Sequence, residues 1–398
     1  MSSIRFINNS SPVKTYIGVG ASAMAGGILR ENGIGKAMLV CDETVLKFGL
    51  ADSVIKSCEE NGVELVIFDK VMPDPVDTMI DEACALYKEE GCQGVIAEGG
   101  GSVLDTGKCV SMLAKNPFNI SYYVMSPMNP FAKGDFLLTI PTTSGTGSEV
   151  SNGAIVTVSR TGTKGGIGGP NLFADMALCD PLLTRTMPKA GTAATGMDVF
   201  AHAIEALLNA YTNPLNDTIA YDAIRLVVNN IKRAVDNGKE DIEARENMMI
   251  AAYYGGMNIN DGPCNYGHSI AHTIGAQYHA PHGAVCAIAS PLTIEHYQYY
   301  FPEKVRKIGE VMGLDIPADA TPREVGTIVA DGIRELNKSI GIPTLADFGI
   351  KYEDLPSIAR LIPYDVTMYT VKATMPDRFF TSDDFLIPLQ REYRRTVG

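Results

Sequence analysis

The stretch Gly94-Val95-Ile96-Ala97-Glu98-Gly99-Gly100-Gly101-Ser102 decides the fold of the amino-terminal half of the chain. Its short apolar run predicts a buried strand, the three glycines predict a tight loop, and a helix is expected to begin near Ser102. The same alternation of apolar runs and helix-compatible stretches recurs on both sides, which is typical of an α/β domain with a parallel sheet. The other strands are expected over 37–41, 64–68 and 136–140, and the other helices over 45–61 and 77–90.

The β pattern ends near the middle of the chain. Strand-like segments over 154–159 and 176–179 are expected to flank a Gly-rich hairpin, and no strand is predicted beyond Asp180. From about Lys189 onward the chain is rich in Ala, Leu and Ile with helical periodicity. A chain of 398 residues ordinarily forms more than one domain. The sequence therefore predicts an α/β domain over 1–186 and an all-α domain over 187–398.

The composition argues against several classes of partner. The net charge is −13 and no run of Lys or Arg occurs, so neither a nucleic-acid surface nor an anionic-membrane surface is expected. The first ten residues lack the apolar segment of a signal peptide, and no stretch reaches roughly 18 uninterrupted apolar residues. A cytoplasmic protein is expected. Its eight cysteines form no C-x-x-C pair and are expected to be reduced and mostly buried.

A carboxylate and three imidazoles form a candidate metal site in the second half. Asp198 and His202 are four residues apart in a segment of helical periodicity, which puts both side chains on one helix face. His268 lies in another helical segment, and His282 lies in the turn after it. A single His on an apolar helix is more often a structural residue than a ligand, but the chain has only six His and they cluster. Three imidazoles and one carboxylate suit Fe(II), Zn(II) or a similar ion.

Two loops at strand ends are candidates for a nucleotide site. Gly99 to Gly101 let the backbone approach a phosphate, and the following helix amino terminus offers free N–H groups, although the same glycines also suit a plain tight turn. The loop from Thr142 to Ser148 carries hydroxyl groups at a strand end, where open α/β sheets bind ligands. The alternative for this loop is a turn in which the hydroxyls serve as caps.

Asp42 directly follows the strand that ends at Cys41. A carboxylate at this position accepts hydrogen bonds from the adenosine ribose diol and repels a 2′-phosphate, which favours NAD over NADP. The competing interpretation is an Asp that only caps the helix beginning at Glu43.

Longer motifs resemble those of the iron-dependent (group III) alcohol dehydrogenases. In the second half they are Gly196-Met197-Asp198-x-x-x-His202-Ala203-Ile204-Glu205-Ala206 and His268-x-x-x-His272-x-x-Gly275-x(6)-His282-Gly283. In the first half they are Gly99-Gly100-Gly101-Ser102-x-x-Asp105-x-x-Lys108 and Ile140-Pro141-Thr142-Thr143-x-Gly145-Thr146-Gly147-Ser148-Glu149. The resemblance spans nearly the whole chain, and the order and spacing of the motifs are together specific. The chain departs from the usual pattern at Glu98, where an apolar or small residue is common, and at Asp74, where Asn is common.

The resemblance implies an NAD(P)-dependent enzyme that interconverts small primary alcohols or diols and aldehydes. Its active site would lie in the cleft between a Rossmann-like dinucleotide-binding domain over 1–186 and a helical metal-binding domain over 187–398. The implied ion is Fe(II), with Zn(II) or another divalent ion as alternatives, and the implied assembly is a homodimer or larger homo-oligomer. The implied metal ligands are Asp198, His202, His268 and His282, and the implied dinucleotide contacts are Gly100, Gly101, Ser102, Thr142, Thr143, Thr146 and Lys164.

The expected reaction is hydride transfer between a nicotinamide and the carbon of an alcohol whose oxygen is bound to the metal. His272, four residues after His268, is interpreted as a proton relay or a contact to the substrate, with a hydrogen-bond partner behind the ligands as the alternative. Glu205 is expected to support the ligands or the fold. Two other functions stay open. One is a lyase of the dehydroquinate-synthase type, although no basic pocket for a phosphorylated sugar acid is evident, and the other is a catalytically silent metal- or nucleotide-binding protein. Metal-dependent NADH consumption with aldehydes distinguishes them.

Overall fold

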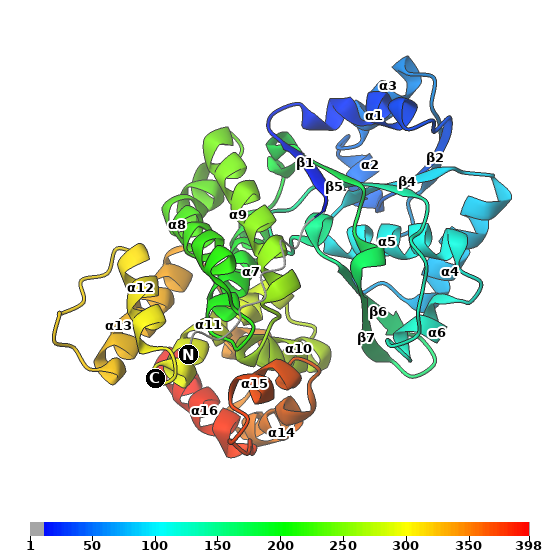
Figure 1. Ribbon diagram of the computed structural model, residues 1–398. Helices are drawn as coiled ribbons and strands as arrows, with labels where there is room; N and C mark the ends of the chain where they lie inside the picture. The colour runs from blue at the N-terminus through cyan, green and yellow to red at the C-terminus, as the bar shows by residue number, and fades with distance from the viewer. Residues whose placement is uncertain (1–11, 398) are drawn as a thin grey trace, which may run out of the picture. The chain divides into compact units, whose positions relative to one another are not determined.

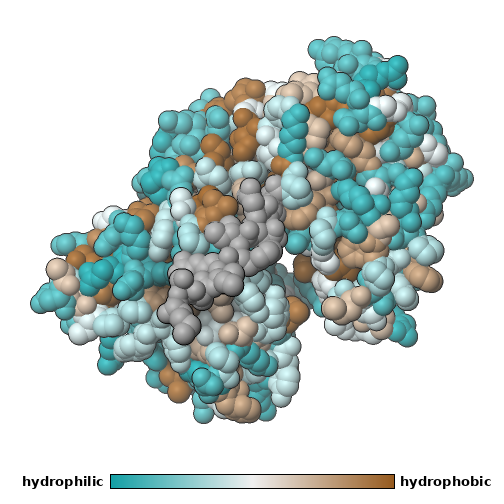
Figure 2. Space-filling model, viewed as in Figure 1, coloured by the Kyte–Doolittle hydropathy of each residue, from teal (hydrophilic) through white to brown (hydrophobic). Residues whose placement is uncertain are grey.

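The computed structural model describes residues 12–397, and this part of the chain divides into two compact units between Thr186 and Met187 (Figure 1). The first ten residues, for which the sequence predicts no signal peptide, lie outside the described range. Hydrophilic side chains cover most of the visible face of each unit (Figure 2). Within residues 12–397, every helix is too short or too polar to cross a bilayer.

The first unit, over 12–186, is built on a parallel sheet of six strands in the order β1-β8-β5-β4-β2-β3. A separate two-stranded antiparallel hairpin lies beside it. The predicted α/β fold is therefore confirmed. Because all six strands are parallel, their carboxyl ends meet at one edge of the sheet. The sheet strands are β1 (Lys14–Ile17), β2 (Lys36–Val40), β3 (Glu64–Phe68), β4 (Gly94–Gly99), β5 (Phe136–Pro141) and β8 (Met176–Cys179), and the hairpin strands are β6 (Gly153–Val158) and β7 (Thr163–Gly168).

Helices cover both faces of this sheet (Figure 1). The apolar side chains of Ile96, Leu138 and Leu178 pack against one helical layer that contains α1 and α3. On the other face α5 lies so close to β4 that a Cβ atom on Gly107 would be 2.3 Å from the Cβ of Ala97. The helices of this unit are α1 (Ala25–Glu31), α2 (Glu43–Lys47), α3 (Asp52–Glu60), α4 (Asp77–Glu89), α5 (Gly101–Lys115) and α6 (Ile120–Val124).

Three details of the first unit differ from the sequence prediction. The stretch 45–61 is not one helix, because Gly49 adopts a left-handed φ of 65° and separates α2 from α3. Segment 176–179 does not flank the hairpin but forms β8, which lies between β1 and β5 in the main sheet. The hairpin instead pairs β6 with the adjacent β7, whose glycines carry little strand propensity. Edge strand β1 was not predicted.

The second unit, over 187–397, contains only helices among its described residues, as predicted. Helix α7 is buried from Gly196 to Leu207 and packs against α8, α9 and α11. Polar side chains on this helix therefore point into protein. The helices are α7 (Lys189–Leu207), α8 (Pro214–Asn237), α9 (Ile242–Asp261), α10 (Tyr266–Tyr278), α11 (His282–Tyr297), α12 (Pro302–Val311), α13 (Pro322–Ser339), α14 (Leu355–Leu361), α15 (Met368–Thr374) and α16 (Asp383–Val397).

Glu98 is a buried carboxyl in the middle of the first unit. It lies two residues after Ile96 on β4, so its side chain faces the same apolar layer. Both carboxyl oxygens are buried and have no hydrogen-bond partner among the described residues. Burial raises the pKa of Glu98 well above its usual value, and the charges of Asp180 and Asp52 act in the same direction.

We expect Glu98→Gln to raise the melting temperature more at about pH 8 than at about pH 5. Because the pKa of Glu98 is raised in the folded state, the folded protein is most stable below the unfolded pKa of this carboxyl and loses stability as the pH rises toward the folded pKa. The Gln variant cannot ionise and does not lose this stability. Thermal unfolding followed by circular dichroism at both pH values measures the difference, with Glu59→Gln on the exposed side of α3 as the control. An equal shift at both pH values would contradict a buried, uncompensated Glu98.

Candidate metal centre and dinucleotide site

The four predicted metal ligands lie together in the second unit. Asp198 and His202 are one turn apart on α7, His268 is on α10, and His282 is the first residue of α11. The Oδ1 atom of Asp198 is 3.5 Å from His282 Nε2, 3.7 Å from His268 Nε2 and 3.8 Å from His202 Nε2. One carboxylate oxygen therefore faces all three imidazoles.

The unpaired atoms of this cluster fit a divalent cation. Asp198 Oδ1 and His268 Nε2 are buried and make no hydrogen bond within the described residues. Unpaired buried polar atoms are costly, and metal coordination is one of the few ways to compensate them. Ligands about 2.0–2.1 Å from a tetrahedral ion lie about 3.4 Å from one another. The spacing around Asp198 exceeds this value by only a few tenths of an ångström, so small side-chain movements would close the site.

Two groups of the cluster, Asp198 and His282, have pKa values shifted toward the forms that bind metals. Burial acts to raise the pKa of Asp198, but the neighbouring imidazoles outweigh it and hold that pKa below its usual range. Desolvation, together with the charges of His268 and His272, lowers the pKa of His282. An ionised carboxylate and a neutral imidazole are the forms that bind metals. The His282 side chain is 42% exposed while the other three ligands are buried, so the cluster is open to solvent on the His282 side.

Glu205 lies behind the cluster and orients His268. It is buried one turn after Ala201 on α7, with its Oε1 atom 3.0 Å from His268 Nδ1. The same oxygen accepts a hydrogen bond from the His268 backbone N–H, and Oε2 accepts one from Asn265 N–H. Gly267 makes room for this contact, since a Cβ there would be 2.5 Å from Oε1. Glu205 thus anchors the start of α10 through two backbone N–H groups and places a carboxylate oxygen beside the His268 ring.

His272 faces the cluster from the next turn of α10. Its ring stacks on that of His282 with centroids 5.4 Å apart, and its Nδ1 atom is 3.2 Å from Asp365 Oδ2. The backbone N–H of Thr367 donates to Asp365 Oδ1 at 2.9 Å and holds the carboxylate in place. Asp365 was not recognised in the sequence, because it lies 93 residues from His272 and in no local motif.

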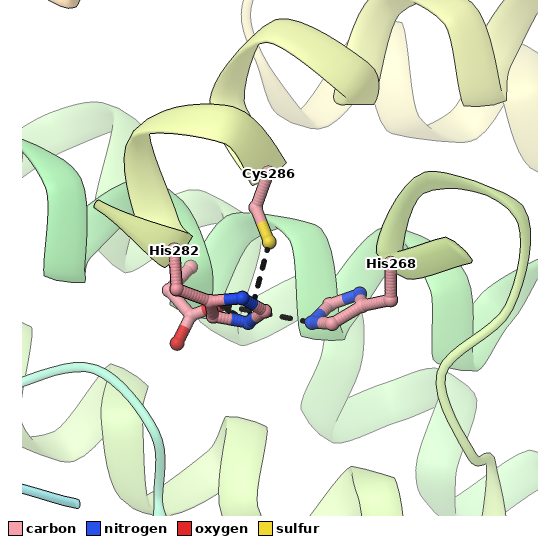
Figure 3. Close-up of side chains that lie close together, drawn as sticks. His268, His282 and Cys286 are labelled. Atoms are coloured by element: carbon pink, nitrogen blue, oxygen red, sulfur yellow. Dashed lines mark hydrogen bonds and ion pairs between the residues drawn. The ribbon is translucent and has the colours of Figure 1, made fainter. Parts of the chain in front are cut away.

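Two cysteines also join the cluster, although the sequence indicated only buried apolar thiols. Cys286 lies on α11 with its Sγ atom 3.5 Å from His282 Nε2 (Figure 3). Cys264 forms a second group with His202 and His268. Although burial acts to raise it, the pKa of Cys264 is lowered to about 6 by interactions with His268 and His202. The one signal in the sequence was the spacing of four residues between His282 and Cys286, the same as between Asp198 and His202.

The predicted nucleotide loops lie at the carboxyl edge of the sheet in the first unit. From β2 the chain moves outward to β3, and it then returns to β4 on the other side of β2. The direction of winding therefore reverses between β2 and β4, and such a switch point is where open α/β sheets bind ligands. Asp42 follows β2 and Gly100 follows β4. The two thus flank this point.

The glycine loop and the threonine loop contact each other. A Cβ on Gly101 would be 2.7 Å from Thr146 Cγ2, and one on Gly100 would be 3.5 Å from Thr143 Cγ2. Thr142 is buried and its backbone N–H donates to Gly99 C=O at 3.0 Å. The amino terminus of α5 begins in this loop with no side-chain cap, which leaves N–H groups at Gly101 and Ser102 for an anion.

Asp105 and Lys108 pair across one turn of α5, with Lys108 Nζ 3.8 Å from Asp105 Oδ1, and each also has more distant partners. Buried Lys108 Nζ donates to Ser148 Oγ at 2.8 Å and to Gly153 C=O at 2.8 Å. Asp105 accepts hydrogen bonds from Ser148 Oγ at 2.6 Å and from Ile155 N–H at 2.9 Å. The two residues also tie α5 to the end of the threonine loop and to β6.

Asp42 and Lys164 each have a protein partner. Asp42 caps α2 by accepting a hydrogen bond from Val45 N–H at 3.0 Å, so the capping role that competed with ribose binding is present. Lys164 Nζ on β7 is 2.6 Å from Asp74 Oδ1 in the loop between β3 and α4. This ion pair holds Lys164 against the loop that follows β3, and this loop begins at the same carboxyl edge of the sheet.

Comparison with known proteins identifies the family. The sequence profile of the iron-containing alcohol dehydrogenases matches residues 12–181, and that of the family's carboxy-terminal domain matches residues 192–375. The chain belongs to the iron-containing alcohol dehydrogenase family. The resemblance seen in the motifs is thereby confirmed, and the protein is an oxidoreductase of this family.

Relatives and solved structures agree with this assignment over nearly the full chain. NAD-dependent methanol dehydrogenase of Bacillus methanolicus is 34% identical over 88% of this chain and 91% of the relative. The 1,3-propanediol dehydrogenase of Klebsiella pneumoniae is 34% identical over 90% of this chain and 93% of the relative. A crystal structure of 1,3-propanediol oxidoreductase superposes with a TM-score of 0.88 at 31% identity, covering 98% of this chain and 100% of that one.

We expect Glu205→Gln to weaken divalent-metal binding by about 10- to 100-fold, the usual effect of removing a carboxylate that supports a metal-ligating His. The amide cannot hold the negative charge beside His268 Nδ1. Competition for Zn(II) against a chromophoric chelator measures the affinity, with exposed Glu240→Gln as the control. If the two variants bind zinc equally well, Glu205 does not support the site.

Proposed function

We propose that this member of the family reduces small aldehydes to primary alcohols or diols, and oxidises the alcohols in reverse, with a divalent metal and preferably NAD(H). The observation that carries the proposal is the convergence of three imidazoles on one unpaired oxygen of Asp198. Relatives named for methanol, 1,3-propanediol and lactaldehyde support a small hydroxylated substrate.

The metal would be held by Asp198, His202, His268 and His282, with Fe(II) as the expected ion and Zn(II) as an alternative. A bound divalent ion supplies a Lewis acid for the substrate oxygen, and the nicotinamide supplies or accepts the hydride. Asp198 provides the negative charge that retains the ion, and Glu205 keeps the His268 ring in its ligating orientation. The exposure of His282 leaves the solvent side of the cluster accessible to a small substrate.

His272 is proposed to carry the proton between the substrate oxygen and solvent. The Asp365 carboxylate beside Nδ1 favours the proton on that nitrogen, which leaves Nε2 to accept or donate during turnover. The ring stacks on His282, so it lies within the immediate surroundings of the ligands. The alternative role, a purely structural partner of Asp365, predicts little loss of activity in His272→Asn.

The dinucleotide is proposed to bind at the switch point of the sheet. Gly100, Gly101 and Ser102 would present N–H groups to the pyrophosphate, with Thr142, Thr143 and Thr146 facing them. Lys164 would reach the same ligand from the hairpin, in competition with its ion pair to Asp74. The Asp42 oxygen that does not cap α2 would accept hydrogen bonds from the ribose diol. The homodimer or larger homo-oligomer implied by the motifs stays a prediction that analytical ultracentrifugation would test.

We expect His268→Ala to lose bound metal and to lose NADH oxidation with short aldehydes. Its affinity for NADH should stay within about twofold of wild type, because His268 and the proposed phosphate-binding loops lie in different units. Metal-free protein is reconstituted anaerobically with Fe(II) or Zn(II), and metal content, turnover and NADH fluorescence are measured. Wild-type turnover without metal, or full metal content in His268→Ala, would contradict the proposed function.

We expect Asp42→Gly to raise kcat/KM for NADPH relative to NADH, by about tenfold or more, because a carboxylate near a 2′-phosphate is strongly unfavourable. Asp42→Asn is the matched variant, since it keeps an oxygen that caps α2 but removes the charge. If neither variant changes the cofactor ratio, Asp42 is only a helix cap.

A further inference from the structure

A sulfur atom completes a group of four donors at the metal cluster. Single ligand atoms of Asp198, His268, His282 and Cys286 all lie within 4.8 Å of one another. His202 is outside this group, although its Nε2 atom is 3.8 Å from Asp198 Oδ1. Among the described residues, a compact set of four donor side chains thus contains a thiol, which the family motifs of the sequence did not indicate.

The spacing of the sulfur fits coordination. With bonds of about 2.3 Å to sulfur and about 2.05 Å to nitrogen, two ligands of a tetrahedral ion are separated by about 3.5 Å. Cys286 Sγ and His282 Nε2 are 3.5 Å apart. His282 Nε2 and Asp198 Oδ1 are also 3.5 Å apart. These atoms therefore already lie at the edge lengths of a coordination polyhedron.

The fold also directs the sulfur into the cluster. His282 and Cys286 are four residues apart on α11, so both side chains project from one helix face. Figure 3 shows them converging with His268. Cys286 is only 1% exposed, and the unpaired oxygen of Asp198 and the unpaired Nε2 of His268 lie in the same group. The Cys286 thiol is within hydrogen-bond distance of His282 Nε2 and shares its group with two residues that carry unpaired ligand atoms, so it is placed to join a metal site.

We propose that Cys286 is a thiolate ligand of the metal in this protein, in addition to the family ligands. The inference rests on the proposed metal site. As the metal–sulfur bond forms, the thiol proton passes to solvent and no electron is transferred. A thiolate is a soft ligand that favours Zn(II) and Co(II) over hard oxygen-seeking ions. With Asp198 it supplies two negative charges and neutralises a divalent ion, so this chain prefers zinc or cobalt to magnesium or manganese.

Cobalt substitution tests the proposal, because a thiolate–Co(II) bond gives a near-ultraviolet charge-transfer band that nitrogen and oxygen ligands do not give. The full-length protein is stripped of metal under reducing conditions and loaded with Co(II). Wild type is compared with Cys286→Ser, with Cys286→Ala and with Cys264→Ala, the matched control at the other thiol of the cluster. X-ray absorption of the zinc form counts sulfur neighbours at about 2.3 Å.

We expect the charge-transfer band and one zinc–sulfur neighbour in wild type and in Cys264→Ala, and neither in the two Cys286 variants. Visible cobalt bands report whether metal is bound at all. Bound cobalt with no charge-transfer band in wild type would overturn the proposal and leave the metal site intact. A band lost only in Cys264→Ala would overturn it in favour of Cys264. Absence of any bound cobalt would overturn the proposed function together with this inference.

Discussion

The buried carboxylate of Asp198 is the constraint on which the functional geometry of the helical unit depends. An ionised oxygen without a hydrogen-bond partner is costly inside a protein, and the three imidazoles around it do not remove that cost by hydrogen bonding. The supporting contacts all act to hold this arrangement. Glu205 fixes the His268 ring, Gly267 makes room for it, and the start of α11 presents His282. The cluster is thus an arrangement that a divalent cation would compensate.

The α/β unit depends on a different constraint, the shared edge of a parallel sheet. The glycine loop after β4 and the threonine loop after β5 come into contact because their strands are hydrogen-bonded neighbours. Lys108 lies on α5, which follows the glycine loop, and its buried ammonium group donates hydrogen bonds to oxygens at the end of the threonine loop and at the start of β6. A buried charge of this kind is stable only when every donor has a partner, so it holds the loops in one relative position.

The family motifs were predictable because their chemistry is local. The spacing of four residues between Asp198 and His202 is a helix periodicity, and the glycine loop is a strand-to-helix transition, so both follow from sequence alone. The contacts that were missed concern residues whose role depends on distant partners. Asp105 and Lys108 pair across one helix turn, but their hydrogen-bond partners lie about 40 residues further along the chain. Asp365 belongs to no family motif and lies far from His272 in the sequence, and Cys286 was indicated only by its spacing of four residues from His282.

The sequence by itself determined the two fold classes, the approximate strand and helix positions, the family and the set of candidate ligands, because these depend on periodicity and on short spacings. Tertiary structure decided strand order, the pairing of the hairpin and the neighbours of each buried polar group. The placement of β8 inside the main sheet illustrates the choice of strand order, and the position of Cys286 beside His282 illustrates the choice of neighbours. The physical reason is that an apolar run or a buried thiol has the same local pattern whatever it packs against, and only the folded chain selects the partner.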